Sequence, residues 1–307
     1  MFGRFKYHIL LHLIIFMWGF TGILGKLIHL EDFIIVWHRV LIASVALLIA
    51  LIFLKKPFKI SNKKELLNIA IVGVIVALHW MTFYRSIQLS TASLGILCLS
   101  TTTLHVTWLE PLVMKRKFSW IEFAMGLVVI YGIYFVSSDF DPAEYEALAY
   151  GLVSALCAAL FSVFNARLAQ DIPSSTITLY ELLTGFVFLS IVLGFNGQLN
   201  ASLFEMRLSD FLWLLFLGIL CTSFAFLATI EVVKRLGAFT VSLSINLEPV
   251  YTILLAIAIL NENEILGSQF YIGSAIIVLV VISNAVIKYY LKSRSERRKQ
   301  LREAADL

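Results

Sequence analysis

Long apolar runs, separated by short segments that carry charges, proline or asparagine, recur along the whole chain. Each run holds roughly 20 residues, enough for an α-helix to cross the roughly 30 Å hydrocarbon core of a bilayer. We therefore predict an all-α polytopic membrane protein without room for a soluble domain. The ten predicted transmembrane helices cover about residues 8–28, 33–54, 65–85, 91–113, 119–138, 147–168, 175–195, 210–233, 238–260 and 266–291.

Composition supports the same class. Of the 307 residues, 60% are apolar and only 14% are charged, whereas a soluble domain carries about 25% charged residues. The mean hydropathy is +0.90. The first apolar run has no cleavage-site pattern after it, so we expect a span there and not a cleaved signal.

The positive charges predict the orientation of the spans. If the N-terminus is cytoplasmic, all but four of the 24 lysines and arginines fall in segments on the cytoplasmic side, as the positive-inside rule requires. The four exceptions are Lys26, Arg39, Arg85 and Arg207. We expect a multi-pass protein of the plasma membrane with both termini cytoplasmic, and we interpret the basic segments as topology signals, not as nucleic-acid contacts.

The chain also repeats itself weakly at an offset of 146 residues. Residues 83–92 align with 229–238, and residues 100–103 align with 246–249. This predicts a first five-helix unit (1–140), a second unit (145–291) and a basic cytoplasmic tail (292–307). Because five crossings are an odd number, the second unit would be inverted, an arrangement typical of secondary transporters with sites near the membrane midplane.

Glu248 and Pro249 lie together near the centre of the ninth predicted span. A charged side chain there costs about 2.5–3.5 kcal/mol on insertion scales, and the proline removes a backbone donor. Two interpretations stay open, a packing kink beside a protonated glutamic acid, or a ligand or proton site. Asn246 would point about 200° away from Glu248 on a regular helix. Glu248 is favoured as the cavity-facing residue because its neighbours form the longer polar stripe.

Several loosely spaced residues resemble the EamA-type members of the drug/metabolite transporter superfamily. They are Trp18-Gly19, Lys26, Arg39 and Ala92 in the first half, and Leu247-x-Pro249 and Leu260-x-Glu262 in the second. The resemblance implies a ten-helix inverted-repeat fold in which spans 1, 3, 4, 6, 8 and 9 surround a central cavity, with spans 5 and 10 outside it. It leaves the substrate open among amino acids, metabolites and toxic compounds. The half-sites differ, because Thr103 stands where the second half has Pro249.

Polar and aromatic residues that share a helical face within the predicted spans are the candidate substrate-binding residues. An aromatic stripe is also found where helices pack, and a histidine in a span also forms hydrogen bonds between helices. A structural role and a binding role therefore both remain open for these residues. Glu248 is the proton-coupling candidate, because burial disfavours the charged form of a carboxyl group. The cavity candidates are Trp18, His79, Trp80, Phe83, Tyr84, Thr101, Thr102, His105, Trp108, Phe161, Asn165, Thr222, Phe226, Ser244, Asn246, Glu248 and Tyr251.

The remaining charges inside spans receive structural interpretations. Arg39 and Glu181 each lie about seven residues into spans 2 and 7, and the inversion would place them in opposite leaflets, so we do not expect them to pair. Glu110 and Glu231 lie near the cytoplasmic ends of their spans, where nearby cations could pair with them. The expected cations are Arg116, Arg167 and Lys234.

These observations favour a secondary transporter that moves a small organic solute by alternating access. A membrane-embedded enzyme is an alternative, although the sequence contains no G-x-S-x-G elbow, metal motif or phosphate-binding glycine loop. A non-transporting scaffold is another. The expected partners are the solute, the lipid bilayer and, with coupling, protons. We expect no cofactor and no metal site, and a monomer or weak homodimer.

Overall fold

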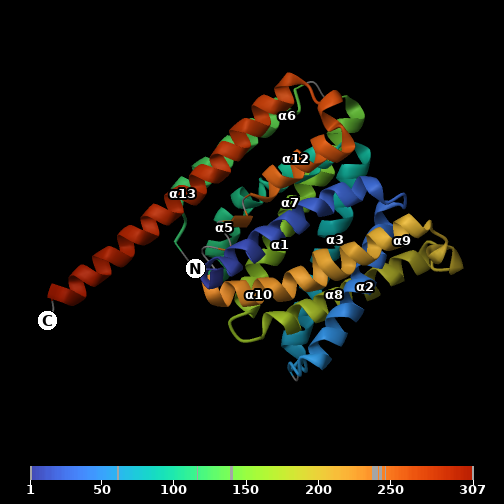
Figure 1. Ribbon diagram of the computed structural model, residues 1–307, viewed down its shortest axis with the longest axis horizontal. Helices are drawn as coiled ribbons and strands as arrows, with labels where there is room; N and C mark the ends of the chain where they lie inside the picture. Colours follow the sequence, from blue (N-terminus) through green and yellow to red (C-terminus); the bar gives the residue numbers. More distant parts are fainter. Residues whose placement is uncertain are drawn as a thin grey trace.

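The computed structural model describes residues 2–60, 62–115, 117–138, 141–236, 241, 244–245 and 247–305. All regular structure within these residues is helical (Figure 1). The elements are α1 (Phe2–Leu27), α2 (Asp32–Phe53), α3 (Lys63–Leu89), α4 (Ala92–Leu99), α5 (Thr102–Met114), α6 (Trp120–Val136), α7 (Pro142–Leu168), α8 (Ser174–Phe195), η1 (Ala201–Phe204), α9 (Leu208–Leu215), η2 (Phe216–Phe224), α10 (Ala225–Leu236), α12 (Glu248–Leu260), η3 (Glu262–Glu264) and α13 (Ser268–Ala305).

The surface of the helices is apolar, which identifies the solvent around them as lipid. Seven of the described helical stretches are long and apolar enough to span a membrane, and three shorter apolar helices accompany them. Large apolar side chains are exposed on the outside of the bundle, among them Phe53, Leu112, Trp120 and Phe195. A soluble protein would not expose so much contiguous apolar surface. The chain is a multi-pass membrane protein.

Most helix boundaries fall within a few residues of the predicted spans, and the ninth span differs. A single helix was predicted over residues 238–260. Within the described part of that range, Leu247 lies in a turn and α12 begins only at Glu248. Proline is favoured in the first turn of a helix, where its missing N–H has no partner to lose. Pro249 therefore lies in the first turn of a helix here, and the single continuous helix predicted over 238–260 is interrupted at Leu247.

The fourth span is broken at the corresponding position of the first half. The helix α4 ends at Leu99, and α5 begins at Thr102, which lies 146 residues before Glu248 at the start of α12. Both second pieces also end alike. Lys115 and Asn261, again 146 residues apart, close α5 and α12 in the left-handed conformation, with φ of 54° and 53°. The weak sequence repeat thus corresponds to a repeated backbone feature.

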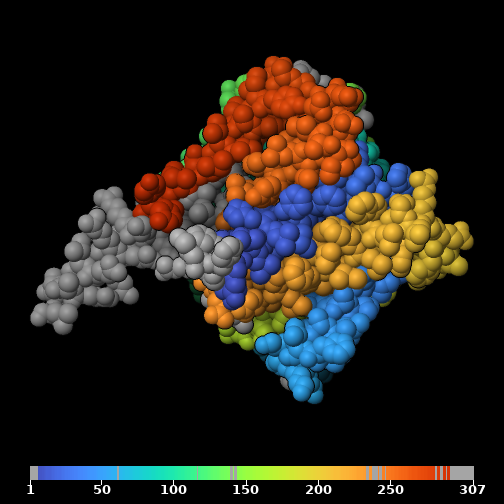
Figure 2. Space-filling view, viewed as in Figure 1, coloured from blue at the N-terminus to red at the C-terminus, as the bar shows by residue number. Residues whose placement is uncertain are grey.

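The packing separates a main bundle from a flanking helix pair. On the face shown in Figure 2, α1 lies between α12 and the segment formed by α9, η2 and α10, and the contacts between these helices agree. The pair α6 and α13 runs along one side of the bundle (Figure 1). These two helices approach closely at Gly132 and Gly273, because a Cβ at Gly273 would lie 2.5 Å from the carbonyl oxygen of Gly132.

Candidate functional site

A cavity of about 540 Å³ lies inside the main bundle, within the size range of small-molecule sites. Its described lining comes from every long helix of the bundle, including α2 and α8, and includes no residue of α6 or α13. Tryptophan and phenylalanine rings form part of the wall, and hydroxyl, amide and charged side chains lie among them. The lining residues are Trp18, Thr21, Arg39, Val76, His79, Trp80, Phe83, Ile96, Leu99, Ser100, Thr102, Thr103, Ala158, Phe161, Ser162, Asn165, Thr178, Glu181, Leu182, Cys221, Thr222, Phe226, Ile245, Glu248 and Pro249.

The two helix breaks bring α5 and α12 to this cavity by their first residues. Thr102 and Glu248 both line it. The carboxylate of Glu248 lies in the first turn of α12, where the helix dipole favours a negative charge. One turn later, the Thr252 hydroxyl donates to the carbonyl oxygen of Gly19, at 3.1 Å, and ties the start of α12 to α1. The absence of a side chain on Gly19 makes this approach possible, since a Cβ there would lie 3.1 Å from Thr252 Oγ1.

Arg39 is a buried cation in the cavity wall, with only 5% of its surface exposed. Its Nε donates to Thr222 Oγ1 at 3.1 Å, and its Nη1 donates to the Tyr84 hydroxyl at 3.2 Å. The guanidinium also lies over the ring of Trp80, 4.1 Å from its centre. All three contacts are with neutral groups. Glu248 lies within electrostatic range of Arg39, but the described residues provide no ion pair at contact distance.

Glu181 is the second buried charged residue of the wall, also 5% exposed. The side chain of Asn165, on α7, lies beside its carboxyl group. The Asn165 side chain is close enough to donate from its amide nitrogen to this carboxyl group, but within the described part of the chain Glu181 Oε1 and Asn165 Oδ1 are buried acceptors without a partner. Helix α3 presses closely against the Glu181 backbone, since a Cβ at Gly73 would lie 2.7 Å from the Glu181 carbonyl oxygen. The position of Glu181 is thus set by backbone packing.

Arg39 and Glu181 face the same cavity at different depths. The ring of Trp37 on α2 lies 5.3 Å from that of Phe186 on α8, and Trp37 Nε1 donates to Ser190 Oγ at 2.9 Å. The helices α2 and α8 run side by side in opposite directions. Glu181 on α8 therefore lies level with a point on α2 about five residues after Arg39, which is roughly 7–8 Å further along the helix axis. The two form no ion pair, as predicted. The inversion was expected to place them in opposite leaflets, yet both side chains line the same cavity.

At one end of the bundle, polar contacts join the helices that surround the cavity. Lys26 at the end of α1 donates from Nζ to the carbonyl oxygen of Ser90, at 2.5 Å. The Glu262 carboxylate, on η3, accepts from the backbone N–H groups of Ala92 and Ser93 at 2.7 and 3.1 Å. Because Glu262 is 3% exposed, these bonds are shielded from water. They join the two halves of the chain at the start of α4.

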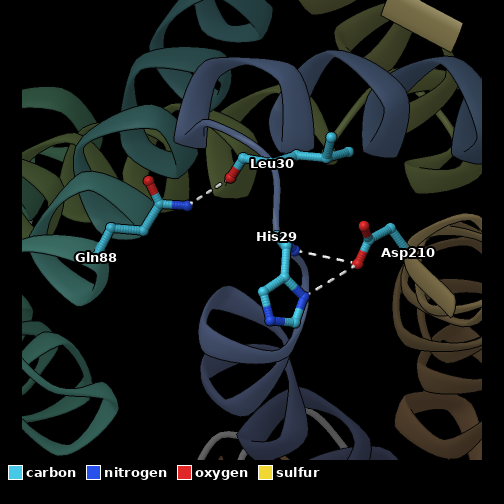
Figure 3. Close-up of polar contacts among 4 residues, drawn as sticks. All are labelled: His29, Leu30, Gln88 and Asp210. Atoms are coloured by element: carbon cyan, nitrogen blue, oxygen red, sulfur yellow. Dashed lines mark hydrogen bonds and ion pairs between the residues drawn. The ribbon is translucent and has the colours of Figure 1, made fainter. Parts of the chain in front are cut away.

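A second set of contacts joins the helices at the same end (Figure 3). Gln88 at the end of α3 donates to the carbonyl oxygen of Leu30 at 2.8 Å, and its side-chain oxygen accepts from the N–H of Asp32 at 3.1 Å. The backbone N–H of His29 donates to Asp210 at the start of α9, also at 3.1 Å. The loop between α1 and α2 is thereby fixed to α3 on one side and to α9 on the other.

The opposite end has different contacts from those predicted. Arg167 donates to the carbonyl oxygen of Val113 at 2.9 Å. Glu231 accepts from Arg235, four residues on, at 3.0 Å, and this hydrogen bond raises the pKa of Arg235. Among the expected cations, Arg167 contacts a backbone carbonyl group, and the partner of Glu231 is Arg235 on its own helix. Arg116 lies outside the described residues.

Comparison with known proteins identifies the family. The profile of the EamA-like transporter family matches residues 5–138 and 146–285, which together cover most of the chain. The chain belongs to the EamA-like transporter family. An uncharacterized transporter of Archaeoglobus fulgidus is 24% identical over 264 residues, covering 84% of this chain and 90% of its own length. The uncharacterized transporter YcxC of Bacillus subtilis is 20% identical over 275 residues, covering 86% of each.

A solved structure shares the fold of this chain. A protein crystal structure that is 15% identical to this chain superposes with a TM-score of 0.62 over 91% of this chain and 98% of its own. At that identity the likeness concerns the fold alone. The resemblance inferred from the sequence motifs is confirmed at the level of the family by the match to the family's profile.

Ten of the candidate residues of this EamA-like protein line the cavity. They are Trp18, His79, Trp80, Phe83, Thr102, Phe161, Asn165, Thr222, Phe226 and Glu248. Arg39 and Glu181 join them, although they were not among the candidates predicted from the sequence. The signal that could have found them is their charge inside an apolar span, which usually faces a bundle interior.

The other candidates lie away from the lining or outside the described residues. Tyr84 is buried behind Arg39 and accepts its hydrogen bond. The Thr101 hydroxyl donates to the carbonyl oxygen of Cys98, and the ring of His105 packs edge-on to Trp108. Thr101 lies in the turn between α4 and α5, and His105 and Trp108 lie further along α5 than Thr102 and Thr103, which line the cavity. A role for these residues in binding stays a prediction. Ser244 and Tyr251 are absent from the lining. The Tyr251 hydroxyl instead forms a hydrogen bond with His12. Asn246 lies outside the described residues.

Proposed function

We propose that this protein is a secondary transporter that carries a small organic solute, an amino acid or a related metabolite, across the plasma membrane by alternating access. The observation that supports this most directly is the central cavity, whose wall both halves of the chain build from aromatic rings and a few buried charges. A site of this size and polarity suits a compact organic molecule with an apolar body and a charged group.

The proposed topology has ten spans in two units, 1–140 and 145–291, followed by a cytoplasmic tail at 292–307. Seven long and three shorter apolar helices supply the spans. The paired helix breaks at Thr102 and Glu248 support a duplicated unit, because both occur 146 residues apart at the cavity. With five crossings in each unit the second is inverted, both termini are cytoplasmic, and the two units can rock against each other around the site.

Glu248 is the proposed proton-coupling residue. It lies in the cavity wall, at the start of a helix that begins inside the membrane, and within electrostatic range of Arg39. A carboxyl group in this position can exchange a proton with the cavity when a solute enters or leaves. Its protonation then alters the charge that the solute and Arg39 experience, which couples the two movements.

The transporter proposal is tested by blocking the cavity. Ser162 lines it from α7, so Ser162→Phe should abolish counterflow of radiolabelled amino acids into liposomes that hold the purified protein. Val153 on the same helix is exposed to lipid, so Val153→Phe is the matched control and should transport as the wild type does. Equal transport by both variants would contradict a cavity route, and product formation in detergent solution would indicate an enzyme instead.

A further inference from the structure

The acceptor pair formed by Glu181 and Asn165 is unusual within the cavity. Both residues line it, Glu181 is at least nine-tenths buried, and Glu181 Oε1 and Asn165 Oδ1 have no hydrogen-bond partner among the described residues. Buried polar atoms in native proteins nearly always have partners, so each unpaired one requires an explanation. Both side chains line one cavity, although these two oxygens themselves have almost no accessible surface. A donor on the cavity's occupant would satisfy them if the side chains turn toward it.

The surroundings of the pair indicate what kind of donor is missing. Arg39, the cation of the wall, is held by Thr222, Tyr84 and Trp80 at a depth roughly 7–8 Å away along α2. Among the described residues, no lysine or arginine forms an ion pair or hydrogen bond with Glu181. A cationic donor on the solute would satisfy both acceptors and offset the carboxylate charge, which a neutral hydroxyl would do only in part.

The groups beside the pair indicate the body of the solute. Phe161 lies one helical turn before Asn165 on α7, so both side chains share a face. Its ring centre is 5.3 Å from that of His79, which in turn stacks with Phe83 at 6.2 Å. His79 is itself anchored, with its ring Nδ1 3.0 Å from the carbonyl oxygen of Ser154. These rings form an apolar wall next to the acceptor pair.

We propose that Glu181 and Asn165 form a subsite for the protonated amino group of the solute, whose apolar or aromatic body packs against Phe161 and His79. This assignment rests on the proposed transport function and specifies its substrate class as small primary amines, with or without an additional acidic group. Glu248 remains the coupling residue, and the amino subsite lies at a separate position in the wall.

Thermal protection of the purified protein in detergent tests the subsite without requiring transport, because a ligand that binds only the folded state raises Tm by mass action. The probes are 2-phenylethylamine, 2-phenylethanol and 3-phenylpropanoate, which share one aromatic body. The amine should raise Tm of the wild type and bind at least about tenfold more weakly to Glu181→Gln, because a charge-assisted bond is lost. Asn165→Leu should weaken it less, and Glu264→Gln, at an exposed position, should leave it unchanged.

The proposal would be overturned by any of three results: equal protection by the amine and the alcohol, equal affinity of wild type and Glu181→Gln for the amine, or no protection of the wild type by the amine. The Tm values without probe show whether each variant is folded. A protein that binds the amine through Glu181 but carries no solute in liposomes would retain the subsite and lose the transport function. If Glu181→Gln transported solute as the wild type does, the transport function would be retained and the amino subsite would be lost.

Discussion

Glu262 offers the sharpest prediction about the stability of the end of the bundle where α4 begins. The helix α4 begins with three N–H groups that lack helical partners, those of Ala92, Ser93 and Leu94. The Thr91 side chain accepts from Leu94 at 3.0 Å. The two carboxylate oxygens of Glu262 accept from the other two, one bond each. All of the first donors of α4 are thus satisfied, two of them by a residue from the other half of the chain.

The cost of removing this carboxylate follows from the two bonds. A buried donor left without a partner costs about 1–3 kcal/mol, so Glu262→Ala should lower the free energy of unfolding by about 2–6 kcal/mol. Glu262→Gln keeps one accepting oxygen, and its loss should be about half as large. Lys26, which lies within electrostatic range of Glu262, would lose a nearby negative charge in both variants.

Reversible unfolding in mixed detergent micelles measures these differences. Glu264→Ala is the control, because Glu264 lies two residues away in the same short helix and is exposed. Substitutions of that kind usually change stability by no more than about 0.5 kcal/mol. If Glu262→Ala were no more destabilising than Glu264→Ala, the hydrogen bonds from the Glu262 carboxylate would not stabilise the start of α4, and this reasoning would be refuted.

Two further substitutions test the packing of the bundle. Gly273→Ala should destabilise by about 1–3 kcal/mol, because the new Cβ would lie 2.5 Å from the carbonyl oxygen of Gly132. Gly194→Ala, with no tight neighbour, should be neutral or slightly stabilising, and equal unfolding free energies for the two would contradict this packing. Asp210→Asn should cost about 1 kcal/mol and speed hydrogen exchange of the His29 amide, whose bond it weakens; unchanged exchange would show that the contact is not formed.

The apolar pattern was sufficient to predict where most helices begin and end, because span length is set by the bilayer and not by tertiary contacts. It also aligned Thr102 with Glu248 before the backbone breaks at both were known. It could not show that Pro249 starts a helix, since a proline inside an apolar run is compatible with a kink or with a new first turn. That distinction requires knowing which groups surround the freed backbone atoms.

Helical periodicity predicted part of the cavity wall. His79, Trp80 and Phe83 on the unbroken α3 all line the cavity. Tyr84 on the same helix does not. Beyond the break between α4 and α5, Thr102 lines the cavity, whereas His105 and Trp108 do not. The roles of Arg39 and Glu181 depend on how α2 and α8 pack side by side, and the distance of a residue from the end of its own helix carries no information about its neighbours.

The most direct test of the transport account uses liposomes that contain the purified protein and a pH-sensitive dye. A panel of amino acids and related metabolites is applied to the wild type, to Glu248→Gln and to Glu264→Gln. The account predicts that at least one solute drives a proton flux in the wild type and in Glu264→Gln, and that Glu248→Gln abolishes this flux while remaining folded. Solute movement without protons in all three proteins would contradict coupling through Glu248 and leave it a structural residue.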